Sequence, residues 1–513
     1  MYLSLILWLP LIAFPIAYLL GRIKGSLARL FTIIVTLVDL FLSLYVWAFL
    51  FDSTKNNLFQ LVEHYEWVKQ AGITYYLGVD GLGIIMVVLT TFLSAMAAIA
   101  SNHIKEREGL YYSLFLLMEG GLLGVFVSLD LFLFFIFWEV VLVPMFFLIG
   151  IWGGPRRKYA AIKFFIYTHI GSVVMLISFF YIYWVWSQAS GMLSFNLLHL
   201  TGQEAYMGTT KLAVENVITS NWTKTILFSA LFFGFAIKVP VVPLHTWLPD
   251  AHVEAPSPIS VILAGVLLKM GGYAILRIAL PLLPSTAQSY ALPIAIIGLV
   301  SIFYAGFVAI WQKDIKRLIA YSSISHMGLV IIGSAAATLG STLALIGAIY
   351  MMFAHGLING LLFLIAGVYK NHVHSRLIPD ISGLTEKMPM TSAFFVYGAM
   401  GGLGLPGLAG FVAEFLIILG AFQNFVVIQQ EWLVALVVFG AILNAAMFLW
   451  AIQRMIFGPQ KKEGDYKDLC LPEIISFSIL GIVILILGVY PPLLVNMVNA
   501  FAQSYVQLFP PIP

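Results

Sequence analysis

Apolar segments about twenty residues long recur along the whole chain and restrict its fold more than any other feature. A hydrocarbon core about 30 Å thick is crossed by roughly 20 helical residues, and within it only helices or closed barrels satisfy every backbone polar group. The 513-residue sequence is 61% hydrophobic and 10% charged, whereas a soluble domain carries about 25% charged residues. We therefore predict an all-α polytopic membrane protein with about 14 transmembrane helices. The predicted segments are 1–20, 29–51, 80–102, 111–129, 131–151, 159–187, 225–249, 256–279, 290–312, 318–337, 340–369, 391–427, 432–456 and 471–497.

Two of these segments carry helix-breaking residues near their middle. In the first, Lys238 is followed two residues later by Pro240, and a proline inside a helix removes a backbone donor and kinks or breaks the helix. The second covers 391–427 and contains the run Gly401–Gly407, which includes Pro406. One straight helix of that length would extend about 55 Å, well beyond the membrane. Paired interruptions in the two halves of a chain are typical of transporters with structural repeats and an ion site at the broken helices.

Lysine and arginine are distributed unequally between the two sets of connecting segments. Nineteen of the 26 fall in connections that share one side and five in the others, while Lys238 and Lys269 lie within predicted spans. Because positive residues gather on the cytoplasmic side, we expect both termini on the outer or periplasmic side. The first charge, Arg22, follows the first apolar run, which is the reverse of the order in a signal peptide. We therefore expect the first helix to be retained.

Several other kinds of site are not supported by the sequence. The single cysteine, Cys470, permits neither an intrachain disulfide nor an iron–sulfur site. His372 and His374 have no further metal-binding side chain nearby in the sequence. The spacing of Gly402–Gly407 matches a dinucleotide-binding pattern, but it lies in a membrane segment without the strand that gives this pattern meaning. Neither a P-loop nor a basic run that would bind nucleic acid is present, so we predict no cofactor or metal in this chain.

A small group of ionisable side chains lies inside the predicted spans. Each costs roughly 2.5–3.5 kcal/mol at the bilayer centre on insertion scales, and pairing, hydration or loss of charge lowers that cost. All three remedies suit proton transfer. The candidate site residues are Glu139, Lys238, Lys269, Glu414, His326, His355 and His245, whereas Asp39, Glu119 and His169 are assigned to helix packing by default.

Glu139 and Lys238 are predicted to form an ion pair between two helices. Glu139 has no cation within one turn of its own helix, and Lys238 has the opposite sign and a similar predicted depth. Pairing keeps both groups charged, whereas separation favours a protonated Glu139 and a neutral Lys238. The pair could thus switch proton affinity, and the alternative is a static ion pair that fixes helix packing. His245 and His252 flank the same break and could deliver protons from the inner side.

Lys269 lies near the middle of its predicted span and is the candidate central proton carrier. Burial disfavours the charged form of a lysine, which can then accept and release a proton near neutral pH; the alternative is a side chain that extends to the interface. Glu414 follows the second break by about two turns and is either a proton-binding group or a neutral structural acid. His326 and His355 could link Lys269 to Glu414, because histidine titrates near physiological pH, or could be satisfied core residues.

Three motifs around these residues resemble one known family. They are DLFLFFIFWEVVLVPM (130–145), KVPVVPLHTWLPDAH (238–252) and DIKRLIAYSSISHM (314–327). All three closely resemble regions of the subunit M family, the antiporter-like, proton-translocating membrane subunits of respiratory complex I (NADH:quinone oxidoreductase). The resemblance is specific and extends from about residue 78 to about residue 460.

The resemblance implies an architecture and a set of roles. It implies fourteen helices, with two inverted five-helix repeats and broken helices 7 and 12. The implied regions are three N-terminal helices over 1–102, helices 4–8 over 111–279, helices 9–13 over 290–456 and helix 14 within 471–513. Glu139 is similar to the family's helix-5 glutamate, Lys238 to its helix-7 lysine, Lys269 to its central helix-8 lysine and Glu414 to its helix-12 acid near the outer exit, while His326 and His355 match its bridging histidines. Glutamate in helix 12 and the lack of a lateral helix favour the M type over the L type.

The function that the resemblance implies is proton movement in a redox-driven pump. A proton would be taken up from inside near Lys238, pass to Lys269 and leave outside through Glu414. The implied partners are neighbouring antiporter-like subunits of the L and N types in a bacterial inner (plasma) membrane, with FMN, iron–sulfur clusters and quinone in partner subunits. The alternatives are a subunit of a multi-subunit Na⁺/H⁺ antiporter, the homologous subunit of a cyanobacterial or plastid ferredoxin:plastoquinone complex, and a scaffold whose charges only orient helix packing.

Overall fold

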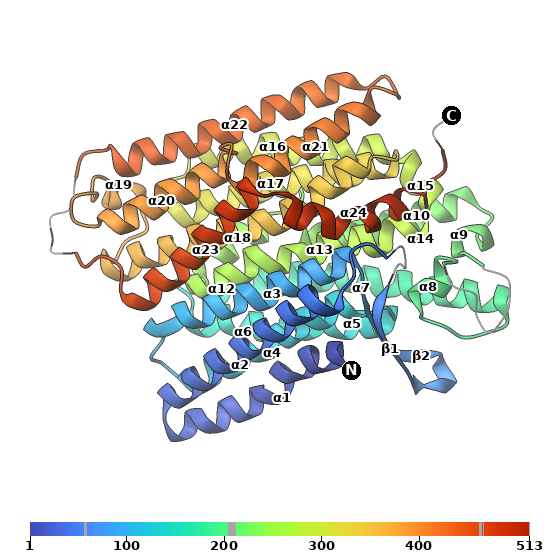
Figure 1. Cartoon of the computed structure of the whole chain (residues 1–513), viewed down its shortest axis with the longest axis horizontal. Coiled ribbons are helices and arrows are strands. Elements are labelled where there is room, and N and C mark those ends of the chain that lie inside the picture. Colours follow the sequence, from blue (N-terminus) through green and yellow to red (C-terminus); the bar gives the residue numbers. More distant parts are fainter. Residues whose placement is uncertain (56–58, 204–211, 461–463, 465, 512–513) are drawn as a thin grey trace.

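Long helices lying side by side form the body of the protein, and a two-stranded hairpin extends from one end (Figure 1). The computed structural model describes the chain except for residues 56–58, 204–211, 461–463, 465 and 512–513. The helices of the first half are α1 (Tyr2–Ile23), α2 (Gly25–Tyr45), α3 (Gly81–Ala100), α4 (Glu108–Val127), α5 (Leu131–Val140), α6 (Leu142–Trp152), α7 (Arg157–Ser190), α8 (Leu197–Leu200), α9 (Val214–Val217), α10 (Asn221–Lys238), α11 (Trp247–Glu254), α12 (Ser257–Ile262), α13 (Leu268–Ala274) and α14 (Leu280–Leu282). Those of the second half are α15 (Pro284–Ser289), α16 (Ala291–Ile310), α17 (Ile315–Thr338), α18 (Thr342–His372), α19 (Ile378–Ile381), α20 (Pro389–Gly402), α21 (Ala409–Phe425), α22 (Glu431–Ile456), α23 (Leu471–Val489) and α24 (Pro492–Val506). The strands are β1 (Gln60–Val68) and β2 (Ile73–Val79), and short π or 3-10 turns are η1 (Val46–Leu50), η2 (Lys69–Ala71), η3 (Ser101–His103), η4 (Leu263–Leu267) and η5 (Ile275–Ala279).

The predicted membrane spans are found again as helices. Over the described residues, 12 helices are long and apolar enough to cross a membrane, and they correspond to 12 of the predicted segments. The other two predicted segments are the broken ones. Segment 225–249 holds α10 and the start of α11, and segment 391–427 holds α20 and α21.

Burial divides the bundle into a centre and a surround. The span 257–282 is buried throughout, the span 342–372 is buried except at its two ends, and α17, α3 and α4 are buried over most of their length. By contrast, α1, α2, α7, α22 and α23 bury only one face. Since lipid-facing residues are apolar whether or not they pack against protein, this difference cannot be derived from hydrophobicity alone. The buried helices carry Lys269, His326 and His355.

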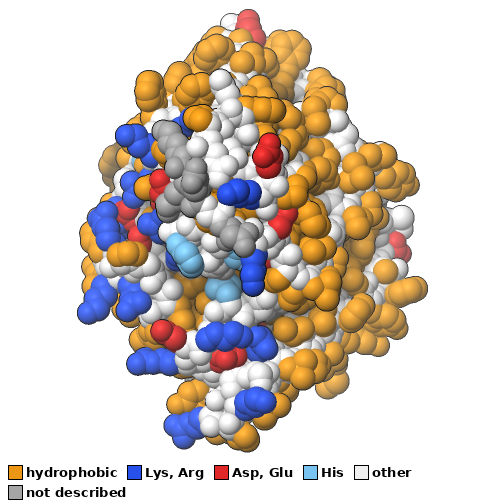
Figure 2. All heavy atoms as spheres, turned by 90° about the vertical axis from the view of Figure 1, so that its left-hand side faces the viewer, with side chains coloured by type: hydrophobic (Ala, Val, Ile, Leu, Met, Phe, Trp, Pro, Cys, Tyr) orange, Lys and Arg blue, Asp and Glu red, His pale blue; other side chains and the backbone are white. Residues whose placement is uncertain are grey.

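The two ends of the bundle differ in charge. Figure 2 looks onto the end of the bundle that lies on the left in Figure 1, and lysine and arginine side chains gather on it while apolar side chains cover the flanks. We call this end the basic face. The opposite end carries the hairpin, α8 and α24, and both chain termini lie toward it (Figure 1); we call it the hairpin face. This arrangement agrees with the predicted charge asymmetry between the two sides.

Three local features differ from the predictions. The connection 52–79, which lies between two predicted spans of an all-α chain, contains the β1–β2 hairpin, in which Gly72 takes a left-handed conformation with φ of 65°. The segment predicted over 131–151 is interrupted at Val141 between α5 and α6, because Pro144 has no N–H to donate to the carbonyl of Val140. The segment predicted over 471–497 ends earlier, at Val489, and Pro492 begins the separate helix α24.

Candidate functional site

The first broken helix ends at a buried cation. α10 stops at Lys238, and the chain continues irregularly until α11 begins at Trp247. The Lys238 side chain is fully buried, and its Nζ has no hydrogen-bond partner among the residues that the structure describes. It lies 5.1 Å from the ring centroid of Trp138 and 5.8 Å from that of Phe164. Aromatic faces attract an ammonium group, so two rings stand where a carboxylate would be expected.

The predicted contact between Glu139 and Lys238 is absent from this structure. Among the described residues no ion pair within 4.0 Å joins them; Glu139 Oε2 instead lies 3.2 Å from His169 Nδ1. Trp138 and Glu139 are consecutive, so on a helix their side chains point about 100° apart. Because Trp138 packs against Lys238, Glu139 is turned toward α7. The structure therefore holds Glu139 against His169 rather than in an ion pair with Lys238.

His169, which the sequence assigns by default to helix packing, is the side chain that contacts Glu139. Its side chain is 48% exposed and that of Glu139 is 26% exposed, so the pair lies on the lateral surface of the bundle. An acid and an imidazole facing lipid carry a high cost, and a neighbouring polar surface would lower it. No sequence signal pairs residue 169 with residue 139, since the contact joins different helices.

Lys269 lies at the centre of the bundle on a distorted helix. The segment Ser257–Leu282 contains two π turns, η4 and η5, which widen the helix and change its hydrogen bonding. Lys269 is fully buried, donates to the carbonyl of Ala264 at 2.5 Å and lies 2.6 Å from Nδ1 of His355. The central base is thus held by one carbonyl and one imidazole, with no carboxylate in hydrogen-bond contact.

Two histidines continue from Lys269 toward the second broken helix. The rings of His355 and His326 are 5.5 Å apart between centroids and nearly perpendicular. Nε2 of His326 lies 3.0 Å from the carbonyl oxygen of Gly402 and 3.8 Å from Oε1 of Glu414. On its other side, His355 Nε2 lies 2.9 Å from the amide nitrogen of Asn359. Lys269, His355, His326 and Glu414 therefore form one buried series.

The second break is shaped around Glu414. α20 ends at Gly402 and α21 begins at Ala409. Gly404 adopts φ of 81°, and a Cβ at this position would lie 2.6 Å from Oε2 of Glu414. Only glycine takes this conformation readily, and only glycine leaves room for the carboxyl group. Glu414 is itself buried.

His245 and His252 do not join this series by contact. His245 is buried beside the first break, with its ring 5.0 Å from that of Tyr304 and no partner at Nδ1. His252 is fully buried and stacks on Phe363 with 4.3 Å between ring centroids, and within the described part of the chain neither of its ring nitrogens has a hydrogen-bond partner. Both histidines lie between the basic face and the centre of the bundle, so a proton would need water to pass through them.

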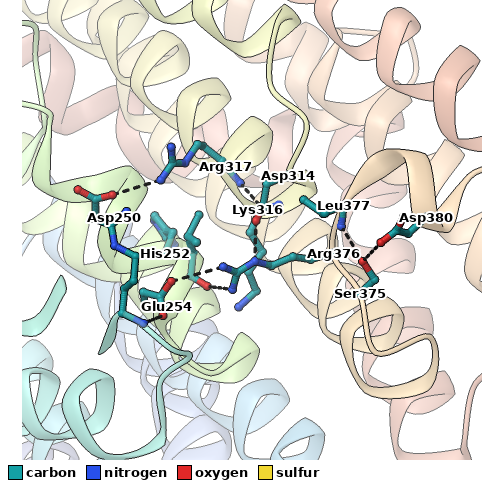
Figure 3. Close-up of polar contacts among 12 residues, drawn as sticks. Asp250, His252, Glu254, Asp314, Lys316, Arg317, Ser375, Arg376, Leu377 and Asp380 are labelled. Atoms are coloured by element: carbon teal, nitrogen blue, oxygen red, sulfur yellow. Dashed lines mark hydrogen bonds and ion pairs between the residues drawn. The ribbon is translucent and has the colours of Figure 1, made fainter. Parts of the chain in front are cut away.

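A network of ion pairs holds the basic end of the first break (Figure 3). Asp250 on α11 binds Lys163 at 2.8 Å and Arg317 at 3.3 Å. Arg376 lies between Glu254 at 3.4 Å and Asp314 at 2.5 Å. Since Asp314 also caps α17, these pairs tie α11 to the start of α17.

Comparison with known proteins identifies the family of the chain. Residues 128–444 match the family described as NADH:quinone oxidoreductase/Mrp antiporter, TM, and residues 12–136 match NADH-ubiquinone oxidoreductase chain 4, amino terminus. The NADH-quinone oxidoreductase subunit M of Rhodobacter capsulatus is 40% identical over 98% of this chain and 96% of its own. The chain belongs to the subunit M family. Within that family, the F(420)H(2) dehydrogenase subunit M of Methanosarcina mazei is 38% identical over 97% of this chain and 96% of its own.

Solved structures share the subunit M fold. A chain of respiratory complex I from Thermus thermophilus has a TM-score of 0.84 and 27% identity, covering 99% of this chain and 100% of that one. A chain of the Mrp complex from Dietzia has a TM-score of 0.82 at 23% identity, covering 98% of this chain and 52% of that one. The second likeness concerns the fold alone. The predicted family and its antiporter-like membrane fold are thus confirmed.

Proposed function

We propose that this chain translocates protons as a membrane subunit of an NADH:quinone oxidoreductase, and that Lys269, His355, His326 and Glu414 carry the protons. The observation that supports this proposal is that the four side chains are buried and follow one another from the centre of the bundle to the second broken helix. Every member can bind and release a proton. A scaffold that used charges only for packing would not need four titratable side chains in succession.

Two steps of the route differ in what they require. At 2.6 Å, Lys269 Nζ and His355 Nδ1 already share a hydrogen bond, so transfer needs only a change in which atom holds the proton. His326 Nε2 and Glu414 Oε1 are 3.8 Å apart, and a small rotation or one water closes that gap. Transfer between the two imidazoles also requires water or ring rotation.

The first break supplies the means of control. A Cβ on Gly271 would lie 2.7 Å from the backbone nitrogen of Val239, so the end of α10 packs closely on the helix of Lys269. In this proposal, the charge on Lys238 influences Lys269 through this packed contact between the two helices. When Glu139 approaches Lys238 it offsets that charge, and when Glu139 turns to His169 the offset weakens. The state of the first break would thus set the proton affinity at the centre.

The energy required is within reach of such a change. Moving one proton against 100 mV requires about 2.3 kcal/mol. A change of two pKa units in the proton affinity of one group corresponds to about 2.7 kcal/mol. This covers the electrical part of the work, and the redox reaction elsewhere in the assembly must drive the switch.

Partner subunits complete the function. FMN, iron–sulfur clusters and quinone belong in this proposal to partner subunits, and the chain contributes proton transfer to the enzyme as a whole. The half-exposed Glu139–His169 pair supports a lateral neighbour of the L or N type. In a bacterial inner membrane the basic face would lie inside and both termini outside. Labelling of single cysteines added at either terminus, in a background with Cys470→Ser, tests this orientation from the two sides of sealed vesicles.

Antiport of Na⁺ and H⁺ is the second candidate, because the fold is shared with a chain of the Mrp complex. One relative is a subunit of an F(420)H(2) dehydrogenase rather than of an NADH-quinone oxidoreductase, so the electron donor also has to be established by experiment. Purified complex in proteoliposomes distinguishes the candidates. NADH-driven acidification that does not depend on sodium supports the proposal, whereas sodium-dependent transport without NADH-linked activity supports antiport.

The deciding variants address both ends of the route. Lys269→Ala, Lys238→Ala and Glu139→Gln should each suppress proton pumping per electron in the reconstituted complex. Lys69→Ala, which changes a lysine exposed on the hairpin face, is the control and should pump normally. A normal proton-to-electron ratio in all three site variants would overturn the assigned roles.

A further inference from the structure

The helix of Lys269 also leads directly to the hairpin face. Tyr273 and Arg277 follow Lys269 at intervals of four residues, which places the three side chains along one side of a helix. All three are buried. A proton held at Lys269 could therefore leave by this short line, as well as by the longer series through His355 to Glu414.

A buried ion pair ends this line. Nη2 of Arg277 lies 2.5 Å from Oδ1 of Asp80, and the two side chains are 6% and 3% exposed. Oδ1 of Asp80 also accepts hydrogen bonds from the backbone N–H groups of Leu82 and Gly83 at the start of α3. The carboxylate is thus fixed by three donors on two helices.

Aromatic rings enclose the guanidinium group. Arg277 Cζ lies 4.9 Å from the ring centroid of Phe59, 5.2 Å from that of Tyr273 and 5.5 Å from that of Phe501. Arg277 Nε donates to the hydroxyl of Tyr273 at 3.2 Å, and that hydroxyl donates to the carbonyl of Phe126 at 3.0 Å. This hydrogen-bond chain ends at a backbone carbonyl, which accepts but cannot pass a proton on.

Each residue of the pair lines one of two small pockets near the hairpin face. Asp80 lines one pocket together with Lys55 and Gln60, and Arg277 lines the other. Phe501 of α24 lines both. The pair thus lies between these pockets and Tyr273, to which Arg277 is hydrogen-bonded.

We propose that the Arg277–Asp80 pair and its aromatic surround are a proton seal. A guanidinium group is always charged and only donates hydrogen bonds, and a fixed arginine is an effective barrier to protons in membrane pores. With the direct line closed, a proton on Lys269 reaches the outer side through the histidines and Glu414, and protons outside cannot return to Lys269 by the direct line. This inference rests on the proposed function, since the seal matters only if Lys269 carries protons.

The test is passive proton conductance of the whole complex in proteoliposomes, measured with an imposed pH difference and without NADH. In the variant Arg277→Met with Asp80→Asn both charges are removed, and asparagine still caps α3. We expect its conductance to rise several-fold, and its proton-to-electron ratio under NADH to fall. Arg277→Lys, which keeps the cation, should remain tight. The matched control is Lys69→Met with Glu66→Gln, an exposed ion pair on the same face, which should leave the conductance unchanged.

The outcomes separate the seal from the route. A double variant that assembles and stays as tight as the native complex would overturn the seal, even if the route is right. Conversely, normal pumping by Glu414→Gln would overturn the proposed route through Glu414, whatever the passive proton conductance of the complex. If the double variant does not assemble, hydroxyl-radical labelling of Tyr273 in the native complex decides: protection supports the seal, and ready labelling overturns it.

Discussion

The two broken helices hold their charges in opposite ways. At the first break, Lys238 is buried with no hydrogen-bond partner, and Glu139 turns to a half-exposed histidine on the lateral surface. At the second, Glu414 is enclosed beside His326, in a space that Gly404 keeps open. The first site can change when a neighbour moves, whereas the second is set by its own backbone. This difference suits a controlling group at one end and a releasing group at the other.

The residues around the two breaks differ in the same way, with ion pairs near the first break and glycine turns at the second. On the basic face, ion pairs from Asp250 and Glu254 of α11 hold the inner part of the first broken helix, whereas Lys238 at the end of α10 has no such pair among the described residues. The second break has short backbone turns in which Gly404 and Gly407 take left-handed conformations. Charge is thus adjustable at the first break, and geometry is fixed at the second.

The largest effect should come from reversing the charge at the first break. Lys238→Glu would place an acid near Glu139 in a fully buried position, and an uncompensated buried charge costs about 3–5 kcal/mol. We expect strongly reduced assembly, measured as the amount of intact complex in membranes. Lys238→Met keeps the volume without the charge and should assemble. Normal assembly and pumping by Lys238→Glu would contradict the importance of an adjustable cation at this site.

A smaller effect should come from closing the space at the second break. Gly404→Ala would force a left-handed residue, at about 1–2 kcal/mol, and would displace the Glu414 carboxyl group. Gly407→Ala is the matched control, because its φ of 94° is equally unfavourable but no atom lies within 4 Å of its Cβ. Gly404→Ala should lower both the unfolding temperature and the rate of proton pumping. Gly407→Ala should lower the unfolding temperature alone. Equal pumping by the two variants would show that the Glu414 carboxyl group tolerates displacement.

The aromatic contact of Lys238 should be measurable as a coupling energy. Replacing Trp138 by phenylalanine weakens the attraction to the ammonium, and the coupling between Trp138→Phe and Lys238→Met in a double-mutant cycle should be about 0.5–2 kcal/mol. Trp138 also donates to the hydroxyl of Ser172 at 3.1 Å, so Ser172→Ala is needed to subtract that bond. Zero coupling would mean that the rings only fill space.

The smallest effect should be on the lateral pair. Because His169 and Glu139 are partly exposed, a cycle of His169→Gln and Glu139→Gln should give a coupling of about 0.2–1 kcal/mol in the isolated chain. In the assembled complex the coupling should increase, since a neighbouring subunit would exclude lipid and water from the pair. The same small value in both preparations would argue against a lateral neighbour at this position.

Local patterns in the sequence were sufficient to predict the spans, the two breaks and the identity of the buried charges. Pro240 and Pro406 break helices wherever those helices pack. By contrast, the partner of Glu139, the π turns around Lys269 and the pair of Asp80 with Arg277 depend on which helices touch. The β1–β2 hairpin was also missed, because its strands lie in a polar connection whose only turn signal is Gly72. Contacts between distant segments leave no periodic pattern in one sequence.

The central claim is that protons reach Glu414 from Lys269 through the two histidines. Infrared difference spectroscopy of the working complex tests it directly, because a carboxyl group that gains and loses a proton changes its C=O absorption. The account predicts a carboxyl signal during NADH turnover that disappears in Glu414→Gln and also in Lys269→Ala. A Glu414 signal that persists unchanged in Lys269→Ala would contradict the account, since protons would then reach the second break by another path.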